Sequence, residues 1–237
     1  MAAGEAGGSQ PHVFETEDGH YMVKVRNNPQ GPRVLVNELV AGLCLDWLEV
    51  HHPEPAIVMI DRALIALSST AKFSDGKVLE HGTAFGSKLW QSDPGGTVSL
   101  DLIENKADVA GTLVFDTWIQ QTDSRQYRVR RSTEVPGRYE YFPIDQGHSF
   151  GNPNWTPAEL AARHAAIAAP APLLKLALED ITAFIERLRA FTMDVAAHIV
   201  GEIPPDWLDQ SARESLQKYL SVRAVPAAEA LEAQFGK

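Results

Sequence analysis

The sequence contains one cysteine, Cys44, and this scarcity excludes two kinds of structure. A single cysteine cannot build an internal disulfide framework or a zinc site made of cysteines, and it fits a reducing compartment. Cys44 falls within an apolar, helix-like run, so we expect its thiol to be buried and unreactive.

Long apolar segments and an excess of positive charge are also missing. No apolar run approaches the roughly 18 residues that a membrane-spanning helix needs, and the Ala- and Gly-rich start lacks the charged and apolar regions of a signal peptide. The 21 Lys and Arg residues are outnumbered by 31 Asp and Glu residues, which gives a formal charge of -10 and argues against a broad nucleic-acid surface. We therefore expect a soluble, cytoplasmic protein without a membrane or nucleic-acid partner.

The chain does have enough apolar material for a globular core, at 44% of its 237 residues. Strand-like runs dominate the first part and helix-like runs the rest, with the change falling near residues 86–97. We expect an α+β fold with a small β-rich N-terminal lobe over residues 1–90 and a mainly helical C-terminal lobe over residues 91–237.

A β-hairpin is expected near the start of the chain. Two strand-like runs, residues 12–15 (HVFE) and 21–25 (YMVKV), flank the turn-forming sequence Glu17-Asp18-Gly19. Lys24 interrupts the second run. A lysine in such a place is either an edge-strand residue that discourages aggregation or a phosphate-binding residue near a buried carboxylate.

A helix is expected from Arg33 to about Val50, because apolar residues recur there at steps of three and four. Glu38 lies beside this apolar stripe. It is either a solvated charge or the partner that fixes Lys24, as a helix glutamate fixes a strand lysine in phosphoryl-transfer enzymes.

Two acidic residues, Asp123 and Asp145, lie about twenty positions apart in the segment from Leu113 to Phe150. We expect this segment to contain the end of a helix, a polar loop with Asp123, a short hairpin and then Asp145. This presentation suits phosphoryl transfer, in which one carboxylate orients the nucleophile and the other holds a metal ion. Surface loops also contain Asp simply because it forms turns.

From Thr156 onward, the sequence predicts helices. Thr156 is a suitable N-cap, and Pro157 suits the first helical position. We expect a helix from Leu173 to Val200 and a last helix from Gln210 to Val222. The apolar stripe of the earlier helix is expected in the core and comprises Leu174, Leu178, Ile181, Phe184, Ile185 and Leu188.

Four stretches resemble the HipA-like kinases, a bacterial branch of the protein-kinase-like fold. They are YMVKVRNNPQGPRVLVNELVAG, HGTAFGS, AGTLVFDTWIQQTDSRQ and FPIDQGHSF, and they occur in that order between Gln10 and Trp155. The resemblance implies a two-lobed fold and an ATP-dependent kinase. Such an enzyme uses ATP and Mg²⁺ to transfer the γ-phosphoryl group to a hydroxyl, for example of a protein serine or threonine.

The resemblance also implies roles for individual residues. Lys24 would contact the nucleotide phosphates and Glu38 would pair with it. Asp123 would be the catalytic aspartate that orients the attacking hydroxyl, and Asp145 would bind the metal.

Further positions follow from the same resemblance. Gly4, Gly7 and Gly8 would belong to the loop that covers the phosphates, although a glycine-rich start is also typical of a disordered terminus. Phe85-Gly86-Ser87 would lie at or just before the hinge that cradles the adenine.

Two positions depart from the family pattern, and they motivate an alternative function. Gln121 and Arg128 stand where family members commonly carry asparagines, the second of which helps to hold the metal. The alternative is a pseudokinase, a nucleotide-binding interaction module without phosphotransfer, in which Arg128 supplies positive charge in place of a second Mg²⁺. A third hypothesis is an unrelated α+β binding domain in which these motifs occur by coincidence.

His148 follows three residues after Asp145, and two roles are open for it. It is either a metal ligand or general base, or a residue that makes a structural hydrogen bond within the loop.

Overall fold

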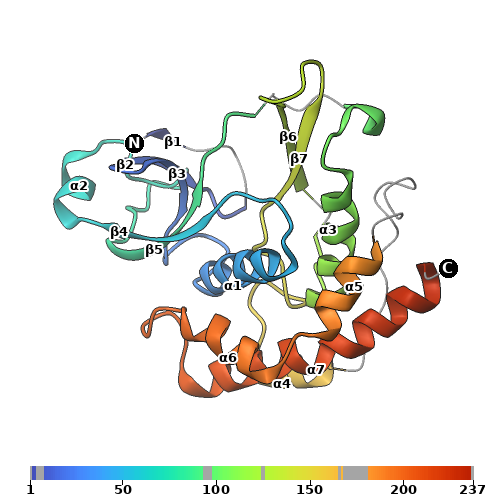
Figure 1. Cartoon of the computed structure of the whole chain (residues 1–237). Coiled ribbons are helices and arrows are strands. Elements are labelled where there is room, and N and C mark those ends of the chain that lie inside the picture. Colours follow the sequence, from blue (N-terminus) through green and yellow to red (C-terminus); the bar gives the residue numbers. More distant parts are fainter. Residues whose placement is uncertain are drawn as a thin grey trace.

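The computed structural model describes residues 2–3, 8–92, 98–123, 126–164, 167 and 181–235 of the chain. In this part of the chain, a β-rich region and a mainly helical region pack against each other (Figure 1). This arrangement confirms the expected α+β class. No helix among the described residues is long and apolar enough to cross a membrane.

The β-rich region contains an antiparallel sheet with the described strand order β1-β2-β3-β5-β4. Its strands are β1 (Ala2–Ala3), β2 (His12–Thr16), β3 (Gly19–Lys24), β4 (Pro55–Ile60) and β5 (Gly82–Lys88). The expected hairpin is present as β2 and β3, with Thr16 paired to Gly19 across the turn. Gly19 has a φ of 122°, a conformation that glycine adopts without steric cost.

Lys24 ends β3, an interior strand that pairs with β2 on one side and β5 on the other. The edge-strand interpretation of Lys24 is therefore wrong. One residue earlier in β3, Val23 pairs with Gly86, where an added Cβ would come within 2.6 Å of a Val58 methyl group. The close packing of β4 on β5 therefore requires glycine at this position.

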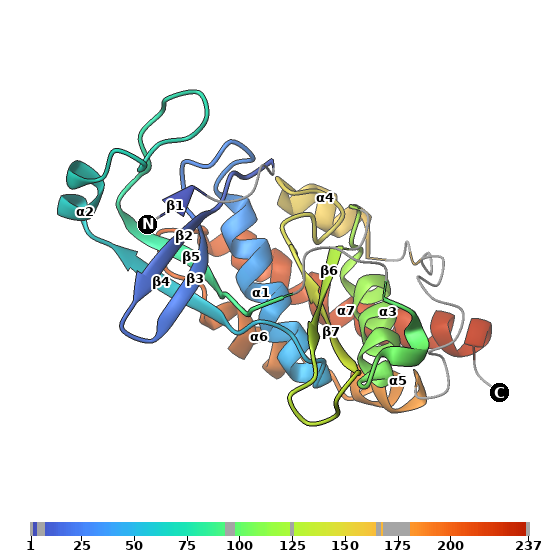
Figure 2. The same cartoon turned by 90° about the horizontal axis from the view of Figure 1, so that it is seen from above.

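Helix α1 (Arg33–Leu48) lies between the sheet and the helical region, as Figures 1 and 2 both show. It belongs to the largest apolar core, together with residues of α3, α5, α6 and α7. Helices that are apolar around most of their circumference are buried in this way. Cys44 on α1 is fully buried, as expected, and burial raises the pKa of its thiol. This packing holds the Glu38 backbone rigidly beside the sheet.

The helical region surrounds α3 (Lys106–Ile119), which contacts α5 and α7. The remaining helices are the short α2 (Arg62–Leu67) beside the sheet, the single turn η1 (Leu100–Leu102), α4 (Pro157–Ala162), α5 (Ile181–Arg189), α6 (Met193–Gly201) and α7 (Gln210–Phe235). Thr156 caps α4 through a complete capping box, with Pro157 as its first residue, as expected. Between α3 and α4, the hairpin of β6 (Gln126–Arg131) and β7 (Tyr139–Ile144) packs on α3.

Two expectations for the C-terminal helices need correction. The expected helix over Leu173–Val200 is interrupted after Arg189, and α6 starts anew where the Thr192 side chain caps it. The last helix does not end at Val222 but continues through Pro226 to Phe235. Leu174 and Leu178 lie outside the described residues. The other members of the expected stripe are buried in the core: Ile181, Phe184, Ile185 and Leu188.

Candidate active site

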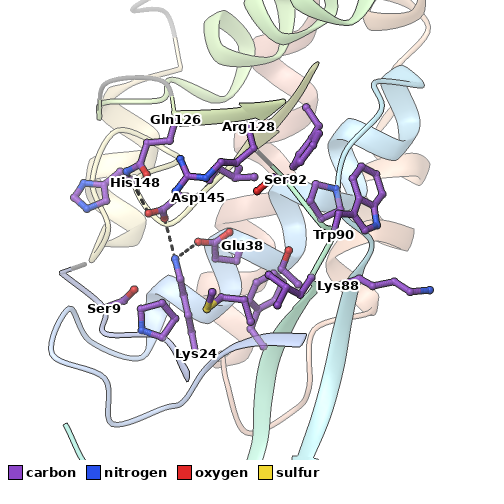
Figure 3. Close-up of a pocket in the computed structure, with 18 of the residues that line it drawn as sticks. Ser9, Lys24, Glu38, Lys88, Trp90, Ser92, Gln126, Arg128, Asp145 and His148 are labelled. Carbon is purple, nitrogen blue, oxygen red and sulfur yellow. Dashed lines mark hydrogen bonds and ion pairs between the residues drawn. The ribbon is translucent and has the colours of Figure 1, made fainter. Parts of the chain in front are cut away.

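A cavity of about 310 Å³ lies between the sheet, the segment after β5 and the β6–β7 hairpin (Figure 3). Its apolar wall includes Met22, Phe85, Leu89, Trp90, Phe142 and Ile144. Its polar wall includes Ser9, Lys24, Glu38, Asp123, Gln126, Arg128, Asp145 and His148. A pocket with one largely apolar end and a few converging polar groups is typical of a small-molecule site.

Lys24, Glu38 and Asp145 meet at the polar end of this cavity. The Lys24 ammonium donates hydrogen bonds to Glu38 Oε1 and to Asp145 Oδ1, the latter at 2.8 Å. Glu38 Oε2 also accepts a bond from the backbone N–H of Gln146 at 2.9 Å. Glu38 is only 5% exposed, so its interpretation as a solvated charge is wrong. The structure thus joins a strand lysine, a helix glutamate and a loop aspartate in one ionic cluster.

The charged groups of this cluster shift one another's pKa values. Burial disfavours the charged Lys24 ammonium, but Glu38 and Asp145 outweigh this effect, and the pKa of Lys24 is raised above its ordinary value. Burial also disfavours the Asp145 carboxylate, yet attraction to Lys24 outweighs it and lowers the pKa of Asp145. Both groups are therefore charged at neutral pH.

Asp145 is held in an unusual backbone conformation, with a φ of 56°. Left-handed backbone is uncommon for residues other than glycine and tends to occur at functional sites. The Gln121 side chain donates to the Asp145 carbonyl at 3.3 Å, and the Gln126 amide donates to Asp145 Oδ2 at 3.3 Å. In the sequence Gln121 is visible only as a departure from the family pattern, and Gln126 was not predicted because its contact depends on the register of the β6–β7 hairpin.

Asp123 lines the same cavity as Asp145, and backbone bonds tie their two loops together. Both the Thr122 N–H and the Thr122 hydroxyl donate to the His148 carbonyl, at 3.3 and 3.0 Å. The Phe150 N–H donates to the carbonyl of Ile119, the last residue of α3, at 2.8 Å. These bonds hold the two acidic residues at one cavity although they come from different loops.

Asn37 anchors the loop that follows Asp145, a role that was not predicted from the sequence. Its fully buried amide donates to the carbonyls of Gly147 and Pro153, at 2.7 and 3.1 Å. Its carbonyl accepts from the indole N–H of Trp155 at 2.8 Å. The Asn-Glu dipeptide of α1 therefore serves the site twice, because Asn37 fixes the loop and Glu38 binds Lys24.

The glycine-rich start is described only in part. Gly8 and Ser9 line the cavity, whereas Gly4 and Gly7 lie outside the described residues. Gln30 lies close to Gly8, and its side-chain amide bonds the His148 ring at 3.0 Å. His148 thus makes a structural hydrogen bond between two loops.

The opposite end of the cavity is aromatic and was also missed. Trp90 follows β5 and packs on the ring of His51 at 4.7 Å and edge-on to Phe142 at 5.0 Å. The Arg130 guanidinium lies 4.4 Å from the Trp90 ring centre. Phe85, expected at or just before the hinge, pairs with Lys24 across β3 and β5 and also lines the cavity. An indole fixed in this way offers a flat, rigid surface on which a planar ligand can stack.

The side chains that line the cavity limit how a metal ion could be bound there. Among the described residues, no three Asp, Glu, His or Cys side chains form a group that could hold a metal ion by themselves. Asp123 and Asp145 nevertheless line one cavity, and Mg²⁺ is commonly bound by one or two carboxylates with phosphate oxygens and water completing its shell. The residues therefore fit a cation that arrives with a phosphate-bearing ligand.

The chain was compared with protein families and with curated proteins. The family model described as HipA-like kinase matches residues 2–228. No curated protein matches the chain.

Three solved structures are similar to this one. The Helicobacter pylori proinflammatory kinase CtkA has a TM-score of 0.62 and 14% identity, with 98% of this chain and 95% of that chain covered. Hydra Fam20 with sugar has a TM-score of 0.55 and 14% identity, with 100% and 86% covered. Shewanella oneidensis MR-1 HipA, from a complex with HipB and operator DNA, has a TM-score of 0.50 and 12% identity, with 97% and 65% covered. At such low identities the likeness is one of fold, and it confirms the expected two-lobed, protein-kinase-like architecture.

Proposed function

This chain belongs to the HipA-like kinase family, and we propose that it transfers the γ-phosphoryl group of ATP to a hydroxyl group, with Mg²⁺ as the divalent cation. The observation that carries the proposal is the position of the Lys24 ammonium between the carboxylates of Glu38 and Asp145, in the wall of the cavity. Protein kinases need a lysine–glutamate pair and a metal-binding aspartate in place together in order to be active.

In this proposal, the cavity binds ATP with its adenine at the aromatic end near Trp90 and its phosphates at the polar end. Lys24 donates to phosphate oxygens, and Glu38 keeps its ammonium in position. Gly8 lies where its backbone can approach the phosphates, and Gly7 is proposed to belong to the same loop. Asp145 is the residue that would hold Mg²⁺, which supplies positive charge against the charge on the phosphate oxygens.

Asp123 acts on the acceptor. Its carboxylate accepts a hydrogen bond from the acceptor hydroxyl and takes the proton as the hydroxyl oxygen bonds to the γ-phosphorus. The bond from the γ-phosphorus to the bridging oxygen breaks, and the bridging oxygen leaves with the electron pair as part of ADP. The products are ADP and a phosphate ester, for which a protein serine or threonine is one candidate acceptor.

The test compares the wild-type protein with Asp123→Asn. With γ-labelled ATP, we expect label transfer and phosphate release to fall by about 100-fold or more, because a positioned base contributes on that order. ATP affinity, measured by calorimetry, should stay nearly unchanged. Asp75→Asn, at an exposed loop of the sheet region, is the matched control and should keep full activity. Equal turnover in Asp123→Asn would contradict the assigned role.

A second candidate is an interaction module that binds the nucleotide without transferring phosphate. Gln121 and Arg128 favour it, because they stand where the resemblance implies asparagines and both contact or line the site. Wild-type protein that binds ATP but releases no phosphate at any Mg²⁺ concentration would support this candidate over the enzyme.

A further inference from the structure

The charges that line the cavity are balanced before any ligand enters. Lys24, Lys88 and Arg128 are the described cationic lining residues, and Glu38, Asp123 and Asp145 are the described acidic ones. The polyphosphate chain of a nucleotide would add several negative charges to this balance. Binding therefore needs positive charge that faces the ligand.

All three of these cations already interact within the protein. The Lys24 ammonium is shared between two carboxylates. Lys88 pairs with Glu54 at 3.1 Å, and Figure 3 shows its side chain extending away from the other labelled residues. Arg128 differs from the two lysines in its chemistry, because the five N–H donors of a guanidinium allow it to keep its protein partner while it also binds a ligand.

The register of the β6–β7 hairpin places Arg128 between the two ends of the cavity. Side chains at alternate positions of a strand point to the same face, so Gln126, Arg128 and Arg130 form one row along β6. Gln126 contacts Asp145 at the polar end, and Arg130 stacks on Trp90 at the aromatic end. Figure 3 shows the Arg128 side chain reaching toward Asp145.

We propose that Arg128 binds the phosphates of the nucleotide nearest the base and thereby serves as a fixed positive charge in place of a second divalent cation. The inference rests on the proposed function for the identity of the ligand. A guanidinium stays charged at every physiological pH and binds phosphate oxygens in a two-pronged geometry.

The position of Arg128 makes the proposal specific. A residue midway between the base and Asp145 reaches the phosphates that ATP and ADP share. Its loss should therefore weaken both nucleotides similarly and leave adenosine unaffected. Because the guanidinium is part of the protein, wild-type protein should retain measurable affinity for ATP when a chelator removes metal ions.

The experiment measures binding of ATP, ADP and adenosine by calorimetry, in excess EDTA and across a Mg²⁺ titration. In EDTA, Arg128→Gln should weaken ATP and ADP by about 10- to 100-fold, the range expected for lost hydrogen bonds to a charged group. Arg128→Lys should keep part of the affinity, and saturating Mg²⁺ should restore part of the loss in Arg128→Gln. Arg131→Gln is the matched control, with the same charge change on the same strand but facing away from the row.

Several results would overturn the proposal. If Arg128→Gln binds ATP in EDTA as tightly as wild type, Arg128 does not contact the phosphates. If adenosine loses affinity as much as ATP does, the substitution has damaged the site and the phosphate role is wrong. If wild-type protein binds adenosine, ADP and ATP equally, the ligand is not recognised by its phosphates, and the proposed kinase function fails together with this inference.

Discussion

The Lys24 ammonium donates a 2.8 Å hydrogen bond to Asp145, a residue 121 positions further along the chain. Lys24 belongs to the sheet, whereas Asp145 begins the loop after β7. Glu38 of α1 completes the cluster and accepts a bond from the backbone of Gln146, next to Asp145. One ionic cluster thus joins the sheet, helix α1 and the loop after β7.

The buried pair of Lys24 and Glu38 makes the cluster important for folding. We expect Lys24→Met to lower the free energy of unfolding by about 3–5 kcal/mol, because it leaves the buried Glu38 charge without its main partner. Urea denaturation measures this change. Adding Glu38→Gln removes the uncompensated charge but keeps an acceptor for the Gln146 N–H, so the double variant should be more stable than Lys24→Met alone. Strictly additive losses would show that the two residues are not coupled.

The lowered pKa of Asp145 predicts how its contribution depends on pH. A carboxyl group whose pKa is lower in the folded than in the unfolded state stabilises the fold above its ordinary pKa, here 3.8. That contribution is lost as the pH falls through the lower pKa of the folded state. The stability difference between wild type and Asp145→Asn should therefore be constant from about pH 7 to pH 5 and should shrink below about pH 4. A difference that stays the same at pH 3 and pH 7 would contradict the shift.

The bonds of Asn37 predict that this residue positions Asp145 without touching the ligand. Asn37→Leu leaves the carbonyls of Gly147 and Pro153 and the Trp155 indole without their partner, so we expect a loss of about 2–5 kcal/mol in unfolding free energy. Asn37→Asp keeps the acceptor for Trp155 but loses the donors to the loop. Because this substitution also places a buried carboxylate against two carbonyl oxygens, it should destabilise the fold and bind ATP more weakly than wild type. Wild-type ATP affinity in Asn37→Asp would show that the loop does not need this anchor.

Trp90 offers both a test of the aromatic end and a probe of binding. We expect Trp90→Ala to weaken adenosine by about tenfold or more, since stacking of a base on an aromatic ring is worth roughly 1–3 kcal/mol. The other four tryptophans do not line the cavity, so the change in tryptophan fluorescence on adding ATP should disappear in Trp90→Phe. A fluorescence change that persists in this variant would place the base elsewhere.

Local patterns allowed the prediction of Lys24, Glu38 and Asp145 as a group, because a strand, a following helix and a strand end are each visible in the sequence. The resemblance to HipA-like kinases supplied the link between them. Asn37, Gln126 and Trp90 escaped prediction because their roles depend on contacts across more than 15 residues or on the register of a hairpin. No local pattern encodes such contacts.

The predicted bounds of the C-terminal helices were wrong for two different reasons. Apolar residues recur between Arg189 and Val200 as well, and the break between the two helices is marked only by Thr192, which caps α6. Thr192 with Asp194 in the first turn is a start signal that could have been found in the sequence. In contrast, α7 extends beyond Val222 because residues such as Ala227 and Leu231 pack into the core, and this packing outweighs the proline inside the helix.

The proposed function requires that the cavity around Lys24 and Asp145 binds ATP together with Mg²⁺. Calorimetry of ATP binding to wild type and to Asp145→Asn, with Mg²⁺ and with EDTA, tests it most directly. We expect Mg²⁺ to tighten ATP binding to the wild type and to have little effect on Asp145→Asn. Wild-type affinity that does not respond to Mg²⁺, or an equal response in Asp145→Asn, would contradict the claim.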